Sequence, residues 1–351
     1  MVFLELHLRP KIPPKLASPQ HTTMRQYLQK LPMFWHERSA ITYLLWPIEI
    51  LYKLTLHIRQ WAYAVGFFEQ QRVHATVIVV GNVVAGGGGK TPLTLAIVQR
   101  MVAQGQTVGV VSRGYGRANS LLQIVNAQSL ASDVGDEPLM IFQKCKVPVV
   151  VGAQRVAAVQ HLLKHFPNVK VIVCDDGLQH LALQRDIEIC VMDAMGLGNG
   201  RLLPAGPLRE PWPRPVDLLL HTHQRTLAQG YESHRALQPY AITFSGKQVA
   251  LADLKSGAVE VVSGIAKPEA FLAMLQQSQL QIIQASALPD HDNFETWTPL
   301  HPELPLLCTE KDAVKLWARF PEALAIPLIF EPEQAFWHAF DRLFQSRHSY
   351  H

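Results

Sequence analysis

The segment that most constrains the fold is residues 77–99, VIVVGNVVAGGGGKTPLTLAIVQ. It joins a β-branched strand pattern to four glycines, a Lys-Thr pair and an amphipathic helical pattern. Such a strand–loop–helix unit binds nucleotide phosphates, because backbone N–H groups and the helix N-terminus both face the anion. The sequence therefore predicts a P-loop nucleotide site formed by Gly86, Gly87, Gly88, Gly89, Lys90 and Thr91.

Each residue type in this loop has a chemical task. Lys90 would bridge the β- and γ-phosphates, and the Thr91 hydroxyl would ligate Mg²⁺. The strict G-x-x-x-x-G-K-[ST] pattern requires glycine at position 84, where this chain has valine, so the loop is a variant. The alternative is a glycine-rich turn that binds nothing, and the Lys-Thr pair after a buried strand disfavours it.

The strand and helix patterns alternate after residue 72. Apolar runs at 107–112, 147–152, 169–174, 187–192 and 216–221 are typical of strands buried on both faces, and amphipathic segments such as 153–165 lie between them. This order predicts an α/β fold with a doubly wound, mostly parallel sheet. Polar, turn-rich sequence at 222–240 then precedes a second, smaller α/β domain.

The expected division is a mobile extension at 1–36, a membrane-associated helical segment at 37–72, a P-loop kinase domain at 73–225 and a smaller closing domain at 226–351. Residues 40–68 have helical apolar spacing, but Glu49, Lys53 and Arg59 interrupt it, so a membrane-spanning helix is not predicted. Trp and Tyr residues in this segment favour an N-terminal membrane-docking helix, broken near Pro47, that lies in the bilayer interface. A helix packed in the core is the alternative.

Composition excludes several classes. A formal net charge of +4 without a concentrated basic motif argues against nucleic acid as a partner. The four cysteines have no metal-ligand or disulfide spacing, which fits a reducing cytoplasm. The first twenty residues lack the continuous apolar core of a signal peptide.

Carboxylates follow the strands where P-loop enzymes hold their metal. The run VKVIVC ends in Asp175 and Asp176, which predicts a Mg²⁺ ligand, although an Asp-Asp-Gly turn is the simpler alternative. Asp136 precedes an apolar segment, where it could cap a helix or accept a proton from a sugar hydroxyl. His291 lies between two aspartates, so its charge could be tuned.

The motifs GGGGKTP, SRGYGR, GDEP, DDGLQH, GNGRLLPAGPLRE, PDH and TEKDAVKL occur in this order. The set resembles the tetraacyldisaccharide 4′-kinase (lipid A 4′-kinase) family over residues 40–340. Two positions depart from the usual pattern, namely Gly88, where threonine is common, and Asp292, where a second histidine often follows.

The resemblance implies ATP and Mg²⁺ as cofactors and assigns roles to residues. Lys90 and Thr91 would serve ATP and Mg²⁺, Asp175 would hold the metal, and Asp136 would be the general base, paired with His291 across an interdomain cleft. The sugar and its phosphate would be contacted by Asp176, Gln179, Arg155, Arg209 and Glu210.

The expected function is therefore transfer of phosphate from ATP to the 4′-hydroxyl of a lipid-linked disaccharide, by a monomer at the cytoplasmic face of the bacterial inner membrane. The residues alone predict only a Mg²⁺-dependent phosphoryl transferase or hydrolase near a membrane. Two rivals are a membrane-docked nucleotide switch and a scaffold that binds nucleotide without turnover. The nearest match to a guanine-recognition motif, at 309–312, lacks the required asparagine.

Overall fold

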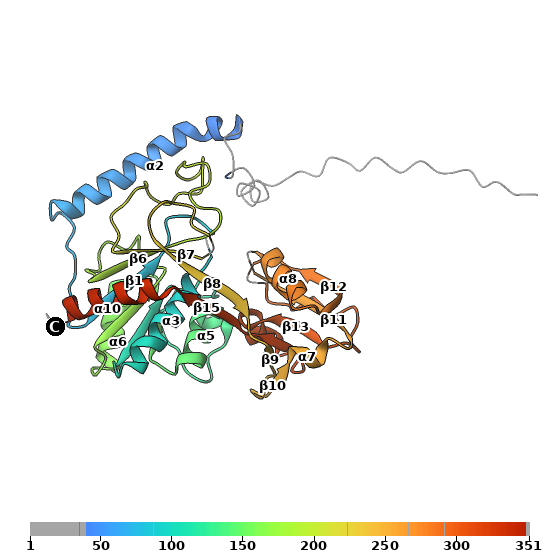
Figure 1. The fold of residues 1–351 in the computed structure, drawn as a ribbon. Helices are drawn as coiled ribbons and strands as arrows, with labels where there is room; N and C mark the ends of the chain where they lie inside the picture. The colour runs from blue at the N-terminus through green and yellow to red at the C-terminus, as the bar shows by residue number, and fades with distance from the viewer. Residues whose placement is uncertain are drawn as a thin grey trace, which may run out of the picture.

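The computed structural model describes Trp35 and residues 40–86, 88–222, 224–265, 267–290 and 292–348. Figure 1 shows two α/β units joined by extended strands, with a long helix lying across one end of the larger unit. The expected extension at 1–36 lies, apart from Trp35, outside the described residues.

The larger unit is built on a nine-stranded sheet with the order β15-β8-β7-β6-β1-β5-β2-β4-β3. Its central strands are parallel, and only β3 and β15 run antiparallel to their neighbours. The strands span Thr76–Gly81 (β1), Val108–Ser112 (β2), Gln123–Ile124 (β3), Val149–Val151 (β4), Val171–Asp175 (β5), Ile187–Met192 (β6), Leu218–His221 (β7), Tyr231–Leu237 (β8) and Leu328–Pro332 (β15). The predicted α/β fold with a large, mostly parallel sheet is confirmed.

Helices cover both faces of this sheet because its central strands are apolar on both sides. Side chains of α3 (Lys90–Ala103), α5 (Asp136–Cys145) and α10 (Gln334–His348) share one core with the sheet. The opposite core contains side chains of α6 (Arg155–His165). The short helix α4 (Ala131–Val134) precedes α5.

The smaller unit has a six-stranded sheet with the order β10-β9-β14-β13-β11-β12. Its elements are β9 (Tyr240–Ile242), β10 (Gln248–Ala250), α7 (Leu251–Leu254), β11 (Ala258–Ser263), α8 (Pro268–Gln277), β12 (Gln281–Ala287), β13 (Leu306–Thr309), α9 (Glu310–Leu316) and β14 (Leu324–Ile326). Strands β8 and β15 and helix α10 follow residue 226 but belong to the large sheet and its core, so the chain crosses between the units twice.

Helix α2 (Ala40–Ala64) lies over the loops that follow β6 (Figure 1). It is continuous through Pro47, so the expected break at that residue is wrong. Its inner face is fixed by polar contacts: Glu49 accepts hydrogen bonds from the Leu202 amide at 2.9 Å and from Arg201 at 3.2 Å, and the Tyr52 hydroxyl donates to the Arg209 carbonyl at 2.7 Å. These hydrogen bonds hold one face of α2 against the loop at residues 201–209.

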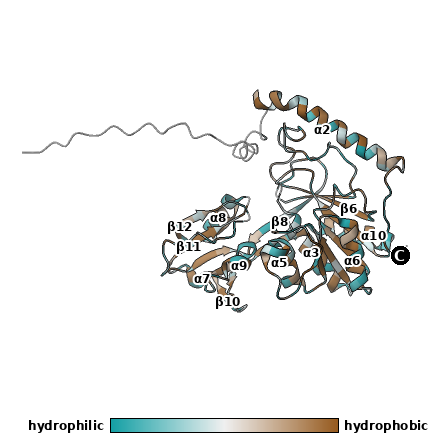
Figure 2. Ribbon diagram, turned by 180° about the vertical axis from the view of Figure 1, so that it is seen from behind, coloured by the Kyte–Doolittle hydropathy of each residue, from teal (hydrophilic) through white to brown (hydrophobic). Residues whose placement is uncertain are grey.

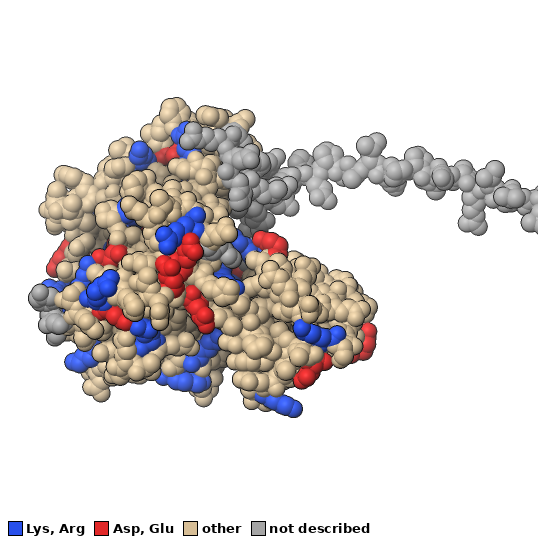
Figure 3. All heavy atoms as spheres, in the orientation of Figure 1, with Lys and Arg blue, Asp and Glu red and all other residues tan. Residues whose placement is uncertain are grey.

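The outer face of α2 is apolar and exposed. Leu44, Leu51 and Ile58 recur every seven residues, with 77%, 62% and 56% of their surface accessible. Apolar colour predominates along the helix in Figure 2, and few charges lie on this end of the molecule in Figure 3. In the described part of the chain, no helix is both long and apolar enough to cross a membrane.

Candidate active site

The glycine-rich loop leads from β1 into α3, as the sequence predicts. Gly86 and Gly89 have positive φ values of 72° and 101°, which glycine adopts without strain. Lys90 and Thr91 form the first turn of α3, where free backbone N–H groups and the helix dipole favour an anion. Gly87 lies outside the described residues.

Asp175 ends β5 beside this loop, at the carboxyl edge of the sheet. It is 1% exposed, and its carboxylate accepts hydrogen bonds from Thr94 at 3.0 Å and from Ser112 at 3.4 Å. Burial, together with the negative charges of Glu137 and Asp176, raises the pKa of Asp175. A carboxylate held in this way would be stabilised by a cation.

Asp176 turns away from the strand with a positive φ of 52°. Its carboxylate accepts two hydrogen bonds from Arg209, at 3.0 and 3.2 Å, and lies 3.8 Å from the Lys90 ammonium. Burial alone would raise the pKa of Asp176, but the charges of Lys90 and Arg209 lower it. The two neighbouring aspartates therefore have opposite electrostatic environments.

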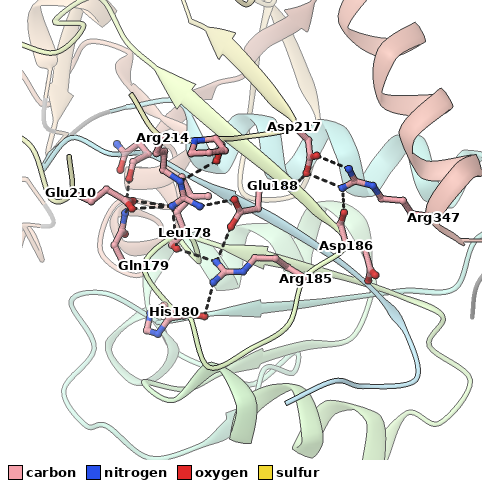
Figure 4. A network of polar contacts seen from close by, with 12 residues as sticks. Leu178, Gln179, His180, Arg185, Asp186, Glu188, Glu210, Arg214, Asp217 and Arg347 are labelled. Carbon is pink, nitrogen blue, oxygen red and sulfur yellow. Dashed lines mark hydrogen bonds and ion pairs between the residues drawn. The ribbon is translucent and has the colours of Figure 1, made fainter. Parts of the chain in front are cut away.

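Gln179 and Glu210 continue this polar cluster beneath α2. The Gln179 amide donates to Glu210 at 2.7 Å, and Glu210 also accepts two hydrogen bonds from Arg214 at 3.0 and 3.1 Å. Figure 4 shows Arg214 between Glu210 and Glu188, which it contacts at 2.5 Å. Because Arg59 of α2 donates to the Gln179 carbonyl at 3.0 Å, the helix is attached to the same cluster.

Arg155 supports the acidic turn from behind. It is 2% exposed, and its guanidinium donates to the carbonyls of Gly152, Asp175 and Asp176 at 2.7, 3.2 and 3.4 Å. Burial, followed by the charge of Arg155, lowers the pKa of His180 to about 4. His180 is thus neutral at pH 7.

Asp136 is the first residue of α5 and is 5% exposed. Its carboxylate forms an ion pair at 2.8 Å with Lys315 of α9, in the smaller unit. The same Lys315 ammonium donates to the Asp292 carbonyl at 2.6 Å. His291 lies outside the described residues, but its neighbour Asp290 is held by Lys311 at 2.8 Å, so α9 fixes both flanks of that position.

A second contact between the units lies at the phosphate loop. The Asp193 carboxylate, directly after β6, accepts hydrogen bonds from the Gly88 amide at 3.1 Å and from Lys267 of the smaller unit at 2.7 Å. Burial raises the pKa of Asp193, but Lys267 and two backbone amides outweigh burial and lower it.

The structure brings most of the predicted residues together. Lys90, Thr91, Asp175, Asp176 and Arg209 gather where β1 and β5 end. Sequence reasoning missed Lys315, Lys267 and Asp193. Asp193 carries the same signal as Asp175, a carboxylate directly after a buried strand, but nothing local marks either lysine.

Metal binding is limited by the number of protein ligands. No group of three or more His, Cys, Asp or Glu side chains in the described ranges could hold a metal ion. Asp175, with the Thr91 hydroxyl at the start of α3, instead fits Mg²⁺, which usually takes only one or two protein oxygens and completes its shell with phosphates and water.

Comparisons with known proteins show which family and fold this chain resembles. The family described as tetraacyldisaccharide-1-P 4'-kinase matches residues 41–345. The tetraacyldisaccharide 4'-kinase of Polaromonas naphthalenivorans is 47% identical over 91% of this chain and 95% of its own length. That of Pasteurella multocida is 40% identical over 80% and 88%. The crystal structure of the "apo" form of LpxK from Aquifex aeolicus in complex with ATP superposes with a TM-score of 0.76, at 27% identity, covering 87% of this chain and 99% of that one.

Proposed function

This chain belongs to the tetraacyldisaccharide-1-P 4'-kinase family, and from that premise we propose how its residues carry out the reaction. The enzyme phosphorylates the 4′-hydroxyl of tetraacyldisaccharide 1-phosphate with ATP, in lipid A biosynthesis. The observation that supports the assignment of roles is the position of Asp175 and Asp176 beside the first turn of α3, where Lys90 lies 3.8 Å from Asp176 and Thr94 donates to Asp175 at 3.0 Å.

Nucleotide binding uses the loop and the first turn of α3. The backbone amides of Gly86–Gly89 hold the phosphates, and Lys90 neutralises the charge that develops during transfer. Mg²⁺ bound by Asp175 and Thr91 would supply further charge neutralisation. The raised pKa of Asp175 supports this role, because a nearby cation would relieve the cost of its ionised form.

Asp136 acts as general base by accepting the proton of the 4′-hydroxyl. Its ion pair with Lys315 at 2.8 Å depends on the smaller unit lying against the larger one. His291 acts with Asp136 from the loop that α9 holds. Asp176, Arg209, Gln179 and Glu210 contact the sugar and its phosphate, while Arg155 shapes the turn that carries both aspartates.

The acceptor is a lipid, so the site must reach a bilayer. Helix α2 supports docking at the membrane surface, because one face is anchored to the Gln179 and Arg209 cluster and the other is apolar and exposed. The enzyme acts as a monomer at the cytoplasmic face of the inner membrane, where ATP is available.

The decisive experiment measures phosphate transfer from labelled ATP to tetraacyldisaccharide 1-phosphate in detergent micelles with Mg²⁺. Lys90→Ala and Asp136→Ala should each reduce kcat by roughly 10²–10⁴-fold, the range for loss of one electrostatic or acid–base group. Asp133→Ala, on the adjoining helix α4, is the matched control and should transfer normally. ATP hydrolysis without labelled lipid would instead support a nucleotide switch.

A further inference from the structure

Arg235 is a partly buried cation that the roles above do not use, and its Nε and Nη2 atoms are fully buried. It lies on β8, one of the two strands that cross between the units (Figure 1), and its cross-strand partner on β15 is Phe330. The guanidinium carbon lies 5.5 Å from the centre of the Phe330 ring, which holds the side chain in place.

The guanidinium points at the phosphate loop. A Cβ atom at Gly89 would lie 2.6 Å from Arg235 Nη2 and 2.4 Å from the Thr222 methyl group. Gly89 is the residue before Lys90, so Arg235 reaches the N-terminus of α3. A side chain at position 89 would collide with it, which is a second reason for glycine there.

Two of the hydrogen-bond donors of Arg235 are not used. Its Nε and Nη2 atoms are buried and have no hydrogen-bond partner in the described part of the chain, and the same holds for the neighbouring Thr222 hydroxyl. Burial lowers the pKa of Arg235 to about 10, so the group is still a cation at neutral pH. Two buried donors without an acceptor are costly, and an anion placed between them would remove that cost.

The surroundings mark an anion position. Asp193 is the carboxylate whose charge acts on Arg235, but it forms no ion pair with Arg235 and is engaged by the Gly88 amide and Lys267. A carboxylate on a loop amide occupies the kind of place that a phosphate oxygen takes.

We propose that Arg235 binds the phosphate chain of the nucleoside triphosphate, donating from Nε and Nη2 in the forked geometry of an arginine–phosphate pair. This inference rests on the proposed function for the identity of the nucleotide. Because β8 also leads into the smaller unit, the contact links nucleotide binding to the strands that join the two units.

The test is calorimetric titration of the full-length protein with ATP and with AMP, without lipid. Arg235→Met should weaken ATP binding at least tenfold and AMP binding much less, since AMP lacks the β- and γ-phosphates. Without nucleotide, Arg235→Met should unfold at the same temperature as the wild type or a higher one, because two buried donors without an acceptor are removed. Arg235→Lys keeps the charge without the fork and should bind ATP with intermediate affinity.

Arg100→Met is the matched control. Arg100 also stacks on an aromatic ring, 4.7 Å from the centre of Trp337, but is paired with Asp341 at 2.5 Å and lies at the far end of α3. This variant should unfold at a lower temperature and bind ATP normally.

Unchanged ATP affinity in Arg235→Met, or equal weakening of ATP and AMP, would overturn the proposal in favour of a purely structural role. Should Arg235→Met not fold, the ratio of ATP to AMP affinity in Arg235→Lys decides in the same way. Nucleotide binding is measured without acceptor. Failure of lipid phosphorylation by the wild type would therefore reject the proposed function, while the effect of Arg235→Met on ATP affinity could still be interpreted.

Discussion

Replacing the stripe Leu44, Leu51 and Ile58 by glutamine should release the enzyme from membranes. Complete burial of such a side chain contributes about 1.5–3 kcal/mol, and 56–77% of the surface of these three residues is exposed and could move from water into the bilayer. Each therefore contributes about 1 kcal/mol, and the triple variant should lose about 3 kcal/mol of binding, on the order of 100-fold in partition. Glutamine keeps helix propensity close to that of leucine, so α2 should persist.

The assay is co-sedimentation with vesicles of bacterial phospholipid, with ATP binding measured in parallel. The control carries the same substitution at Leu121, Leu130 and Leu300, whose exposed fractions of 66%, 63% and 66% are similar but which lie in loops outside α2. The α2 variant should remain in the supernatant while binding ATP normally, and the control should sediment. Equal sedimentation of the two variants would refute the docking role of α2.

Three further outcomes follow from the polar contacts. The raised pKa of Asp175 means that the nucleotide-free protein loses stability as pH rises from near 3.8 toward the raised value. Asp175→Asn should therefore unfold at a higher temperature than the wild type, and this difference should grow between pH 5 and 8. His180 has a pKa lowered to about 4, so the wild type loses stability as pH falls from about 6.5 to 4. The difference in unfolding temperature between the wild type and His180→Gln should therefore be smaller at pH 5 than at pH 7. Glu49→Gln removes a charge from its hydrogen bonds to Arg201 and Leu202, so about 1.5–3 kcal/mol of α2 docking should be lost, measured as faster proteolysis within α2.

Local patterns predicted the elements that form the nucleotide site. Residues 77–99 contain the strand, the glycines and the helix start in one continuous stretch, and Asp175 directly follows a buried strand. Parallel strands bring their carboxyl ends to one edge, so these local signals also predicted that the side chains gather there. The helix over Ala40–Ala64 was predicted from spacing, but its continuity through Pro47 was not, because the contacts that hold the helix at Glu49 and Tyr52 come from residues more than 150 positions away in the sequence.

The contacts between distant segments could not be predicted in the same way. Asp136 and Lys315 are far apart in sequence, and in the sequence alone each is an ordinary helix residue with no sign of its partner. The same is true of Asp193 with Lys267, and of Arg235 beside Gly89. These pairs form because the chain crosses between the two sheets along β8 and β15, which sets the smaller unit against the larger one.

The sequence by itself determined most of the strands and helices of the large sheet and which family the motifs resemble, and it predicted a phosphate loop, because those inferences depend on neighbouring residues and on period. The tertiary structure decided which carboxylates are stabilised by lysine or arginine, which face of α2 remains exposed and which cation lacks a partner. Those properties depend on distance and burial, and a linear pattern specifies neither.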